Sequence, residues 1–153
     1  MNATSSDLAS QAAVSALYQD LLAAWNKHSA SEYAELFDEN GSVVGFDGSI
    51  MDGRSEIEGE LSRIFADHET GRYVGKIRSV RLLSADTVLL HAVAGVIPAG
   101  QKELNPALNT IQSLVAVQGK AGWRIAHYHN TPAQFHGRPE LSDALTEELR
   151  WLQ

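Results

Sequence analysis

The hydrophobic pattern of this chain changes period at about residue 72. Before that point, apolar side chains recur at helical spacing, and the pattern predicts helices over residues 7–28, from Ser29 to Asn40-Gly41, and over 54–69. After that point, long β-rich runs predict strands over residues 72–84, 87–97, 108–118 and 122–130. Pro139 then opens a last helix, over residues 139–152.

Short connections and one turn dipeptide indicate how these elements are arranged. Asp47-Gly48 accepts positive φ angles and predicts a short β-hairpin between the second and third helices. The late strands are joined by short loops, so they form an antiparallel meander. We expect an α+β fold in which helices pack on one face of a curved antiparallel sheet and enclose a cone.

Composition and charge narrow the class of protein. The chain of 153 residues fits a single domain over residues 1–153, with residues 1–6 as a flexible tail and 139–152 as an extra C-terminal helix. A net charge of −7 without a basic run argues against nucleic acid or an anionic membrane as partner. No apolar run approaches the roughly 18 to 20 residues of a membrane span, no signal peptide is visible, and the cytoplasm is the expected location.

The final strand carries the most informative side chains. Strict alternation would place Trp123, Ile125, His127 and His129 on one face, apolar at its start and imidazole-bearing at its end. Such a strand is typical of a pocket floor, with His127 deeper than His129. Both are the candidate catalytic residues, because imidazole titrates near neutral pH and can act as acid or base. A purely structural role for both, in which one hydrogen-bonds inside the cone and the other caps the strand, stays open.

A metal site is a weaker interpretation of the same residues. His127 and His129 have the spacing of a shared metal, and His91 is a candidate third ligand. No carboxylate stands at a ligand spacing nearby, and the zero cysteines exclude thiolate ligands and disulfides. We predict no metal and no cofactor, since a dinucleotide-binding fingerprint is also missing.

Further side chains are candidates for contacting a ligand in the cone. Trp25, Tyr33 and Phe65 are expected at its mouth, although inward aromatic residues also serve as plain core. The amides of Asn109 and Gln112 extend from the sheet. The complete predicted ligand-binding set is Trp25, Tyr33, Phe46, Phe65, His91, Asn109, Gln112 and Trp123.

Three segments carry a resemblance to a known family: AAWNKHSASEYAELF, GFDGSIMDGRSEI and GWRIAHYHNTPAQF. With the order of elements, they resemble the nuclear transport factor 2-like superfamily, which has a cystatin-like fold and includes ketosteroid isomerases and SnoaL-like polyketide cyclases. Within it, the segments look like the SgcJ/EcaC family, and the last is also similar to the calcium/calmodulin-dependent kinase association domain. The resemblance implies a cone-shaped cavity and a homodimer formed through the outer face of the sheet.

Differences between this sequence and those families limit which of their site residues can be expected here. Ketosteroid isomerases use a general-base Asp with a Tyr and an acidic donor, and the matching strands here carry no evident equivalent. The kinase association domain lines its cavity with arginines, but Val93 and Leu114 stand near those positions here. A carboxylate ligand is therefore not expected.

Two functional hypotheses remain. The leading one is a homodimer that binds a small, largely apolar metabolite in the cone, with isomerase-like or cyclase-like proton transfer at the histidines. The alternative is a non-catalytic assembly or accessory module that acts through protein contacts. Both faces of the strand at 87–97 are largely apolar, which favours a covered outer face in either case.

Overall fold

The computed structural model describes residues 4–153. Its helices are α1 (Ser5–Asn26), α2 (Ala30–Glu35), α3 (Arg54–Asp67), the short 3₁₀ turn Pro106–Leu108, and α4 (Pro139–Arg150). Its strands are β1 (Phe37–Val44), β2 (Ile50–Asp52), β3 (Arg72–Ser84), β4 (Thr87–Ile97), β5 (Thr110–Gly119) and β6 (Gly122–Pro132). The four predicted long strands are thus confirmed within two residues at each end.

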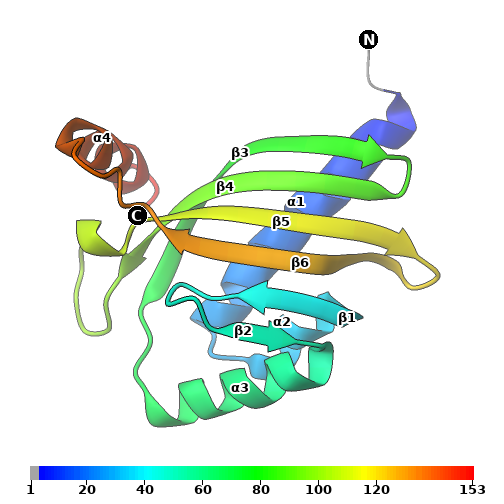
Figure 1. Cartoon of the computed structure of the whole chain (residues 1–153), viewed down its shortest axis with the longest axis horizontal. Coiled ribbons are helices and arrows are strands. Elements are labelled where there is room, and N and C mark those ends of the chain that lie inside the picture. The colour runs from blue at the N-terminus through cyan, green and yellow to red at the C-terminus, as the bar shows by residue number, and fades with distance from the viewer. Residues whose placement is uncertain (1–3) are drawn as a thin grey trace.

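One sheet joins all these strands in the order β2-β1-β6-β5-β4-β3 (Figure 1). The stretch from β3 to β6 is the predicted antiparallel meander, and β1 with β2 forms the predicted hairpin. However, β1 runs parallel to β6, so the sheet is mixed rather than purely antiparallel. The prediction missed this because the hairpin joins the far edge of the meander, a long-range pairing that no local pattern encodes.

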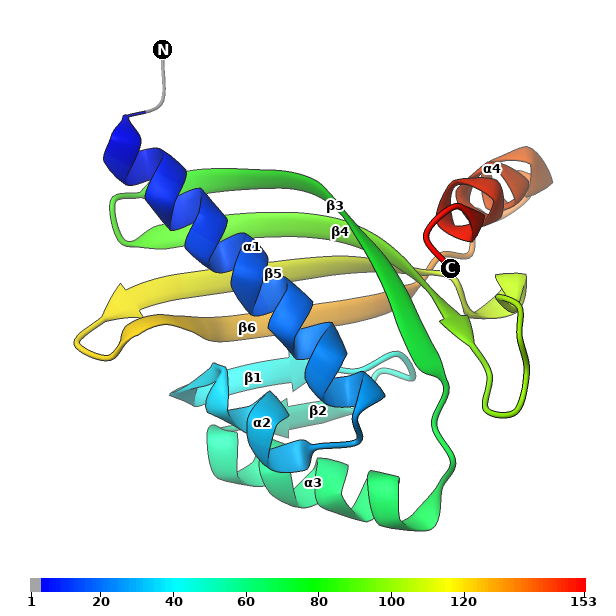
Figure 2. The same cartoon turned by 180° about the vertical axis from the view of Figure 1, so that it is seen from behind.

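Helix α1 crosses the inner face of the sheet diagonally, with α2 and α3 beneath it (Figure 2). It starts with a capping box, in which the Thr4 hydroxyl accepts from the Asp7 N–H and the Asp7 carboxylate accepts from the Thr4 N–H. The predicted tail is therefore wrong for residues 4–6, and residues 1–3 lie outside the described part of the chain. The buried stripe of α1 includes Val14, Leu17, Tyr18, Leu21 and Leu22.

The second helix is shorter than predicted. Ser29 caps α2 by accepting from the Glu32 N–H, as expected, but the helix ends at Glu35, and Asn40-Gly41 lies inside β1 rather than at a helix stop. A Cβ atom on Gly41 would lie 2.8 Å from the carbonyl oxygen of Ile125. This glycine therefore permits the close approach of β1 to β6. From the sequence alone, an Asn-Gly pair used in this way looks the same as one that ends a helix.

Helix α4 covers part of the outer face, so the expectation of helices on one face only is wrong. Its Leu145 and Leu149 bury against Val93 of β4. Glu148 forms ion pairs with Lys76 at 2.9 Å and Arg78 at 2.7 Å.

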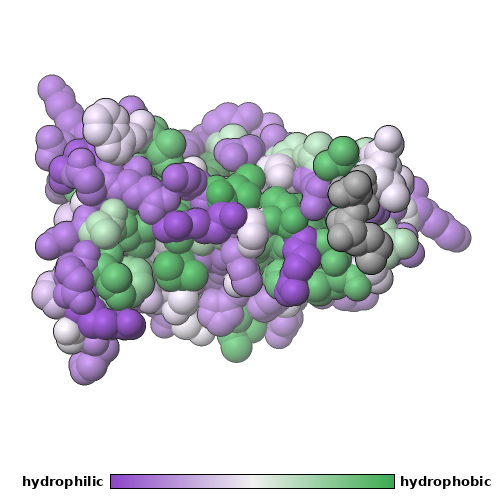
Figure 3. Space-filling view, turned by 90° about the horizontal axis from the view of Figure 1, so that it is seen from above, coloured by the Kyte–Doolittle hydropathy of each residue, from purple (hydrophilic) through white to green (hydrophobic). Residues whose placement is uncertain are grey.

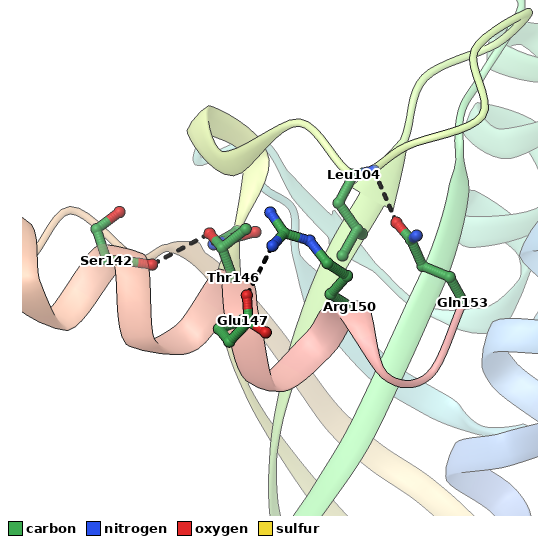
Figure 4. Close-up of polar contacts among 7 residues, drawn as sticks. Leu104, Ser142, Thr146, Glu147, Arg150 and Gln153 are labelled. Atoms are coloured by element: carbon green, nitrogen blue, oxygen red, sulfur yellow. Dashed lines mark hydrogen bonds and ion pairs between the residues drawn. The ribbon is translucent and has the colours of Figure 1, made fainter.

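Hydrogen bonds fasten the last turns of this helix (Figure 4). Thr146 donates to the carbonyl oxygen of Ser142, and the Gln153 side chain accepts from the backbone N–H of Leu104. Leu145 and Leu149 are thus buried, whereas Leu141 and Leu152, nearer the two ends of the segment, stay exposed.

The largest core cluster lies between α1 and the inner face of the sheet and includes Tyr18, Leu21, Phe37, Leu114 and Ile125. Seen from above, over the β3 edge, hydrophobic areas at the surface are interrupted by hydrophilic side chains (Figure 3). Across residues 4–153, none of the helices combines the length and apolar character that crossing a membrane requires.

Candidate functional site: a cavity between the long helix, the hairpin and the last strand

A cavity of about 310 Å³ lies between α1 and α2, the β1–β2 hairpin, α3 and the sheet. Most of its lining is apolar or aromatic, and the polar groups are few. The lining residues are Leu21, Leu22, Trp25, Tyr33, Val43, Gly45, Phe46, Asp47, Ser49, Ile50, Met51, Glu60, Ile64, Tyr73, Tyr128 and Asn130. An apolar hollow of this size with a few converging polar groups is the usual form of a small-molecule site.

The histidines of β6 do not line this cavity, because the strand contains a β-bulge. In the pairing with β5, Val115 faces His127 but the next residue, Ala116, faces Ile125, so Ala126 is an extra residue. The bulge exchanges the two faces: Ile125 is buried in the core, and after it Tyr128 and Asn130 point inward. The prediction that Ile125 and the histidines share one face is therefore wrong, as is the deep position of His127.

Three of the predicted ligand-binding residues line the cavity: Trp25, Tyr33 and Phe46. Phe65 packs against Trp25 instead, with ring centroids 5.1 Å apart in an edge-to-face arrangement. Trp123 packs against the core without reaching the cavity wall.

The remaining predicted residues lie elsewhere on the sheet. His91 is exposed on β4, paired with Ser113 of β5. Asn109 is buried and donates to the Thr146 hydroxyl of α4 at 2.7 Å. Gln112 is buried on the inner face, where it donates a hydrogen bond to Asn130 of the cavity lining.

The aromatic wall of the cavity is fixed by contacts with Trp25. Its indole N–H donates to the carbonyl oxygen of Gly71 at 3.1 Å, and the Tyr73 ring packs edge-to-face on it at 5.6 Å. The centroid of the Tyr33 ring lies 6.3 Å from that of Trp25. Such aromatic contacts stabilise one arrangement of the wall, which is a requirement for a preformed binding site.

A chain of buried polar side chains ends at this wall. Tyr18 hydrogen-bonds Gln112 at 2.5 Å, and Gln112 hydrogen-bonds Asn130 at 3.2 Å. Asn130 also contacts the Thr110 hydroxyl, and its amide nitrogen donates to the Tyr73 hydroxyl at 2.9 Å. Buried polar groups are costly unless paired, and here each one satisfies the next.

Two further hydroxyls lie at the cavity without a partner of their own. Within residues 4–153, no hydrogen bond involves the hydroxyl of Tyr33 or of Tyr128, although both side chains are buried. Burial raises the pKa of both phenols, and the neighbouring tyrosines add to the effect. Both groups therefore stay protonated and available as hydrogen-bond donors at neutral pH.

The carboxylates at the cavity are already engaged. Asp47 accepts from the backbone N–H of Ser49 at 2.9 Å, and this bond holds the pKa of its carboxyl below the ordinary value. Glu60 pairs with Arg63 on the surface of α3. A carboxylate with a lowered pKa is a weak base, so this arrangement favours binding over proton abstraction.

On the outer face, His127 hydrogen-bonds the Ser42 hydroxyl through Nδ1 at 2.8 Å. Desolvation holds the pKa of His127 below its ordinary value; His129 acts in the same direction and Asp52 opposes it. His127 lies on the opposite face from the cavity. Across the described residues, no three His, Cys, Asp or Glu side chains gather as a metal site would require.

Sequence reasoning missed the polar part of the site, namely Tyr73, Tyr128 and Asn130. Strict alternation along β6 assigned Tyr128 and Asn130 to the other face. A usable signal existed: the inward residues of β5, Thr110, Gln112, Leu114 and Ala116, alternate without interruption, and Gln112 pairs directly with Asn130. Gln112, a polar residue among the inward side chains of β5, therefore marked the part of the sheet where the inner face is not made of apolar core alone.

A long helix across the inner face of a curved, mostly antiparallel sheet, with a cavity between them, defines the nuclear transport factor 2-like or cystatin-like α+β class. The model of the SnoaL-like domain matches residues 14–133, and the chain belongs to this family.

Solved structures agree on the fold. A Nostoc punctiforme domain of unknown function with a cystatin-like fold is 26% identical in sequence, with a TM-score of 0.80. The match covers 93% of this chain and 86% of the Nostoc chain. A protein from Thiobacillus denitrificans that is described as a calcium/calmodulin-dependent protein kinase type II association domain is 16% identical, with a TM-score of 0.69. The match covers 78% of this chain and 94% of the Thiobacillus chain.

A ketosteroid isomerase-like protein from Erwinia carotovora atroseptica is also similar. It is 16% identical over 80% of this chain and 95% of its own, with a TM-score of 0.62. A search of curated proteins finds no match. The narrower SgcJ/EcaC assignment remains a prediction.

Proposed function

We propose that this protein binds a small, largely apolar molecule in the cavity and holds one polar atom of it with tyrosine hydroxyls. The observation that carries the proposal is a preformed apolar hollow of about 310 Å³ into which Tyr33 and Tyr128 bring hydroxyls that no described residue uses. A bound molecule that excludes water from the cavity would have to supply an acceptor for these hydroxyls in place of solvent.

Proton transfer at the histidines, as expected from the sequence, receives less support. Neither His127 nor His129 is among the cavity-lining residues, and the Asp47 carboxylate is held in a turn. Binding therefore accounts for the described site without a catalytic base.

The experiment uses two bicyclic probes of fitting size, the hydrocarbon tetralin and the ketone 1-tetralone, followed by NMR of the ¹⁵N-labelled protein. We expect the amide signals of Val43, Met51 and Tyr128 and the indole signal of Trp25 to shift together. Met51→Trp should fill the cavity and weaken binding at least about tenfold. Leu83→Trp adds the same side chain at an exposed site on β3 and should leave affinity unchanged.

Shifts confined to the outer face, or equal affinities of the two tryptophan variants, would contradict binding in the cavity. A weak but saturable response is sufficient support, because the probes only approximate the natural ligand.

We also propose a homodimer formed through the part of the outer face that α4 leaves uncovered. Leu89, Val115 and Val117 are only half-buried there, beside the exposed His91. Half-buried aliphatic side chains on a sheet face are better covered than left in water. Sedimentation at micromolar concentration should give twice the chain mass, and Val115→Lys should give the monomer; a monomeric parent would exclude the dimer.

A further inference from the structure

We propose that the chain Tyr18–Gln112–Asn130–Tyr73 directs the hydroxyl proton of Tyr73 into the cavity, so that the ligand atom beside Tyr73 is a hydrogen-bond acceptor such as a carbonyl oxygen. The inference rests on the proposed binding function and narrows the class of ligand. It makes Tyr18 and Gln112, which do not line the cavity, positioning residues for the site.

The direction of the chain is set at its buried end. The Tyr18 side chain is fully buried, and among the hydrogen bonds of residues 4–153 its hydroxyl has one partner, the side chain of Gln112 at 2.5 Å. A hydroxyl has a single proton, which must reach an acceptor when water is excluded. Gln112 must therefore turn its amide oxygen, rather than its nitrogen, toward Tyr18.

That choice is passed along the chain. With its oxygen on Tyr18, Gln112 presents its amide nitrogen to Asn130 at 3.2 Å, and Asn130 accepts with its oxygen. Thr110 fits either orientation of Asn130, since its hydroxyl can also donate to the carbonyl oxygen of Thr131 at 2.8 Å. The amide nitrogen of Asn130 is then left to donate to Tyr73 at 2.9 Å.

Tyr73 consequently accepts from the protein and keeps its own proton free. Within residues 4–153 the Tyr73 hydroxyl donates no hydrogen bond, and both Tyr73 and Asn130 line the cavity. Burial raises the pKa of Tyr73, so the hydroxyl is protonated at neutral pH. An acceptor on the ligand matches this donor, whereas an ammonium group in the same place would leave the Tyr73 proton without a partner.

The reverse direction is disfavoured by the same geometry. If Tyr73 donated to Asn130, both amides would turn over and the buried proton of Tyr18 would have no acceptor in the described chain. Gly75 supports the observed arrangement, because a Cβ atom there would collide with the Tyr18 hydroxyl. The absence of a side chain on β3 leaves the space that this hydroxyl needs to reach Gln112.

The test compares 1-tetralone with tetralin, which differ by one carbonyl group, in four proteins. The parent should prefer the ketone about tenfold, the effect of one good hydrogen bond. Tyr73→Phe removes the donor and should abolish the preference while tetralin still binds. Tyr18→Phe keeps the ring but frees both amides to turn over, so the preference should fall to about twofold or less.

Thr146→Val is the matched control, since it removes a buried hydroxyl on α4, away from the cavity. It should keep the preference of the parent. Tyr18→Phe with an undiminished preference would overturn the directing role of the chain, and equal affinity of the parent for both probes would overturn the inference alone. Binding of neither probe to the parent would overturn the proposed function, and the ligand class with it.

A readout without ligand checks the same point. Nuclear Overhauser contacts from the Asn130 side-chain amide protons should reach the ring of Tyr73 in the parent and move toward the Thr110 methyl group in Tyr18→Phe. Contacts to the Thr110 methyl group in the parent would show that the hydrogen bonds from Tyr18 to Tyr73 run in the opposite direction, and would overturn the inference.

Discussion

The two faces of the sheet use polar residues in different ways. On the inner face, Gln112 and Asn130 are almost completely buried and bonded to each other, and their chain reaches the cavity wall. On the outer face, His129 is exposed and His127 is held mainly by Ser42. One extra residue, Ala126, separates these two settings along a single strand. A polar side chain in a strand thus gains its role from the face on which a bulge places it.

The largest expected contrast is between adjacent residues on opposite faces. Asn130→Leu removes an acceptor for Gln112 and a donor to Tyr73, so we expect it to lower the free energy of unfolding by about 3 kcal/mol. His129→Asn on the exposed face should stay within about 0.5 kcal/mol of the parent. Urea denaturation followed by circular dichroism measures both. Similar losses for the two variants would mean that the faces do not differ as described.

A smaller contrast is expected between two strand glycines that lie under helices. A Cβ atom on Gly75 would lie 2.5 Å from Leu22 Cδ1 of α1, beside the fixed Tyr18 hydroxyl. Gly75→Ala should therefore cost about 2 kcal/mol through overpacking.

Gly95 faces α4, and its closest neighbour would be the end of the flexible Leu104 side chain, 2.7 Å away. Gly95→Ala should cost less than about 1 kcal/mol, because that side chain can move. Thermal unfolding of the two variants checks the order, and a reversed order would show that α4 is packed more rigidly than α1.

The smallest expected effect is a pH dependence that arises on the outer face. The pKa of folded His127 is lowered, chiefly by desolvation, with a contribution from His129 and opposition from Asp52. The unfolded chain therefore takes up the proton first as the pH falls through about 6.5, the ordinary histidine value. Stability should decline below that pH until the folded pKa is passed.

His127→Gln should flatten this decline without altering stability above pH 7, as measured by urea midpoints between pH 5 and 8. Because His127 is only half-buried, water screens part of the effect and the change should be slight. An unchanged pH profile in the variant would assign the decline to other groups.

Local patterns predicted most elements of this fold but not how they join. The β3 to β6 meander and its turns follow from hydrophobic period and turn chemistry, which act over a few residues. The parallel pairing of β1 with β6 and the packing of α4 on Val93 depend on contacts distant in sequence. Trp25 and Tyr33 were identified because a helical stripe keeps its face over its whole length.

The polar half of the cavity was missed because strand alternation fails at a single inserted residue. Ala126 has nothing in its side chain that marks it as a bulge, since the irregularity arises from the pairing with β5 and β1 together. Gly41 was misread for a related reason: its small size serves close contact with Ile125 rather than a helix end. Both errors concern one residue whose role is set by a partner strand.

The parallel pairing of β1 with β6 also has a consequence for how the protein is made. The cavity takes its walls from residues 21–64, which are synthesised early, and its floor from Tyr73, Tyr128 and Asn130. Since β6 is the last strand of the sheet, a growing chain holds the β1–β2 hairpin before the strand with which β1 pairs. Pairings so distant in sequence form slowly and leave apolar surface exposed meanwhile. The binding site is therefore among the last parts of the molecule to be completed, and a nascent chain halted before residue 122 would lack its Tyr128 and Asn130.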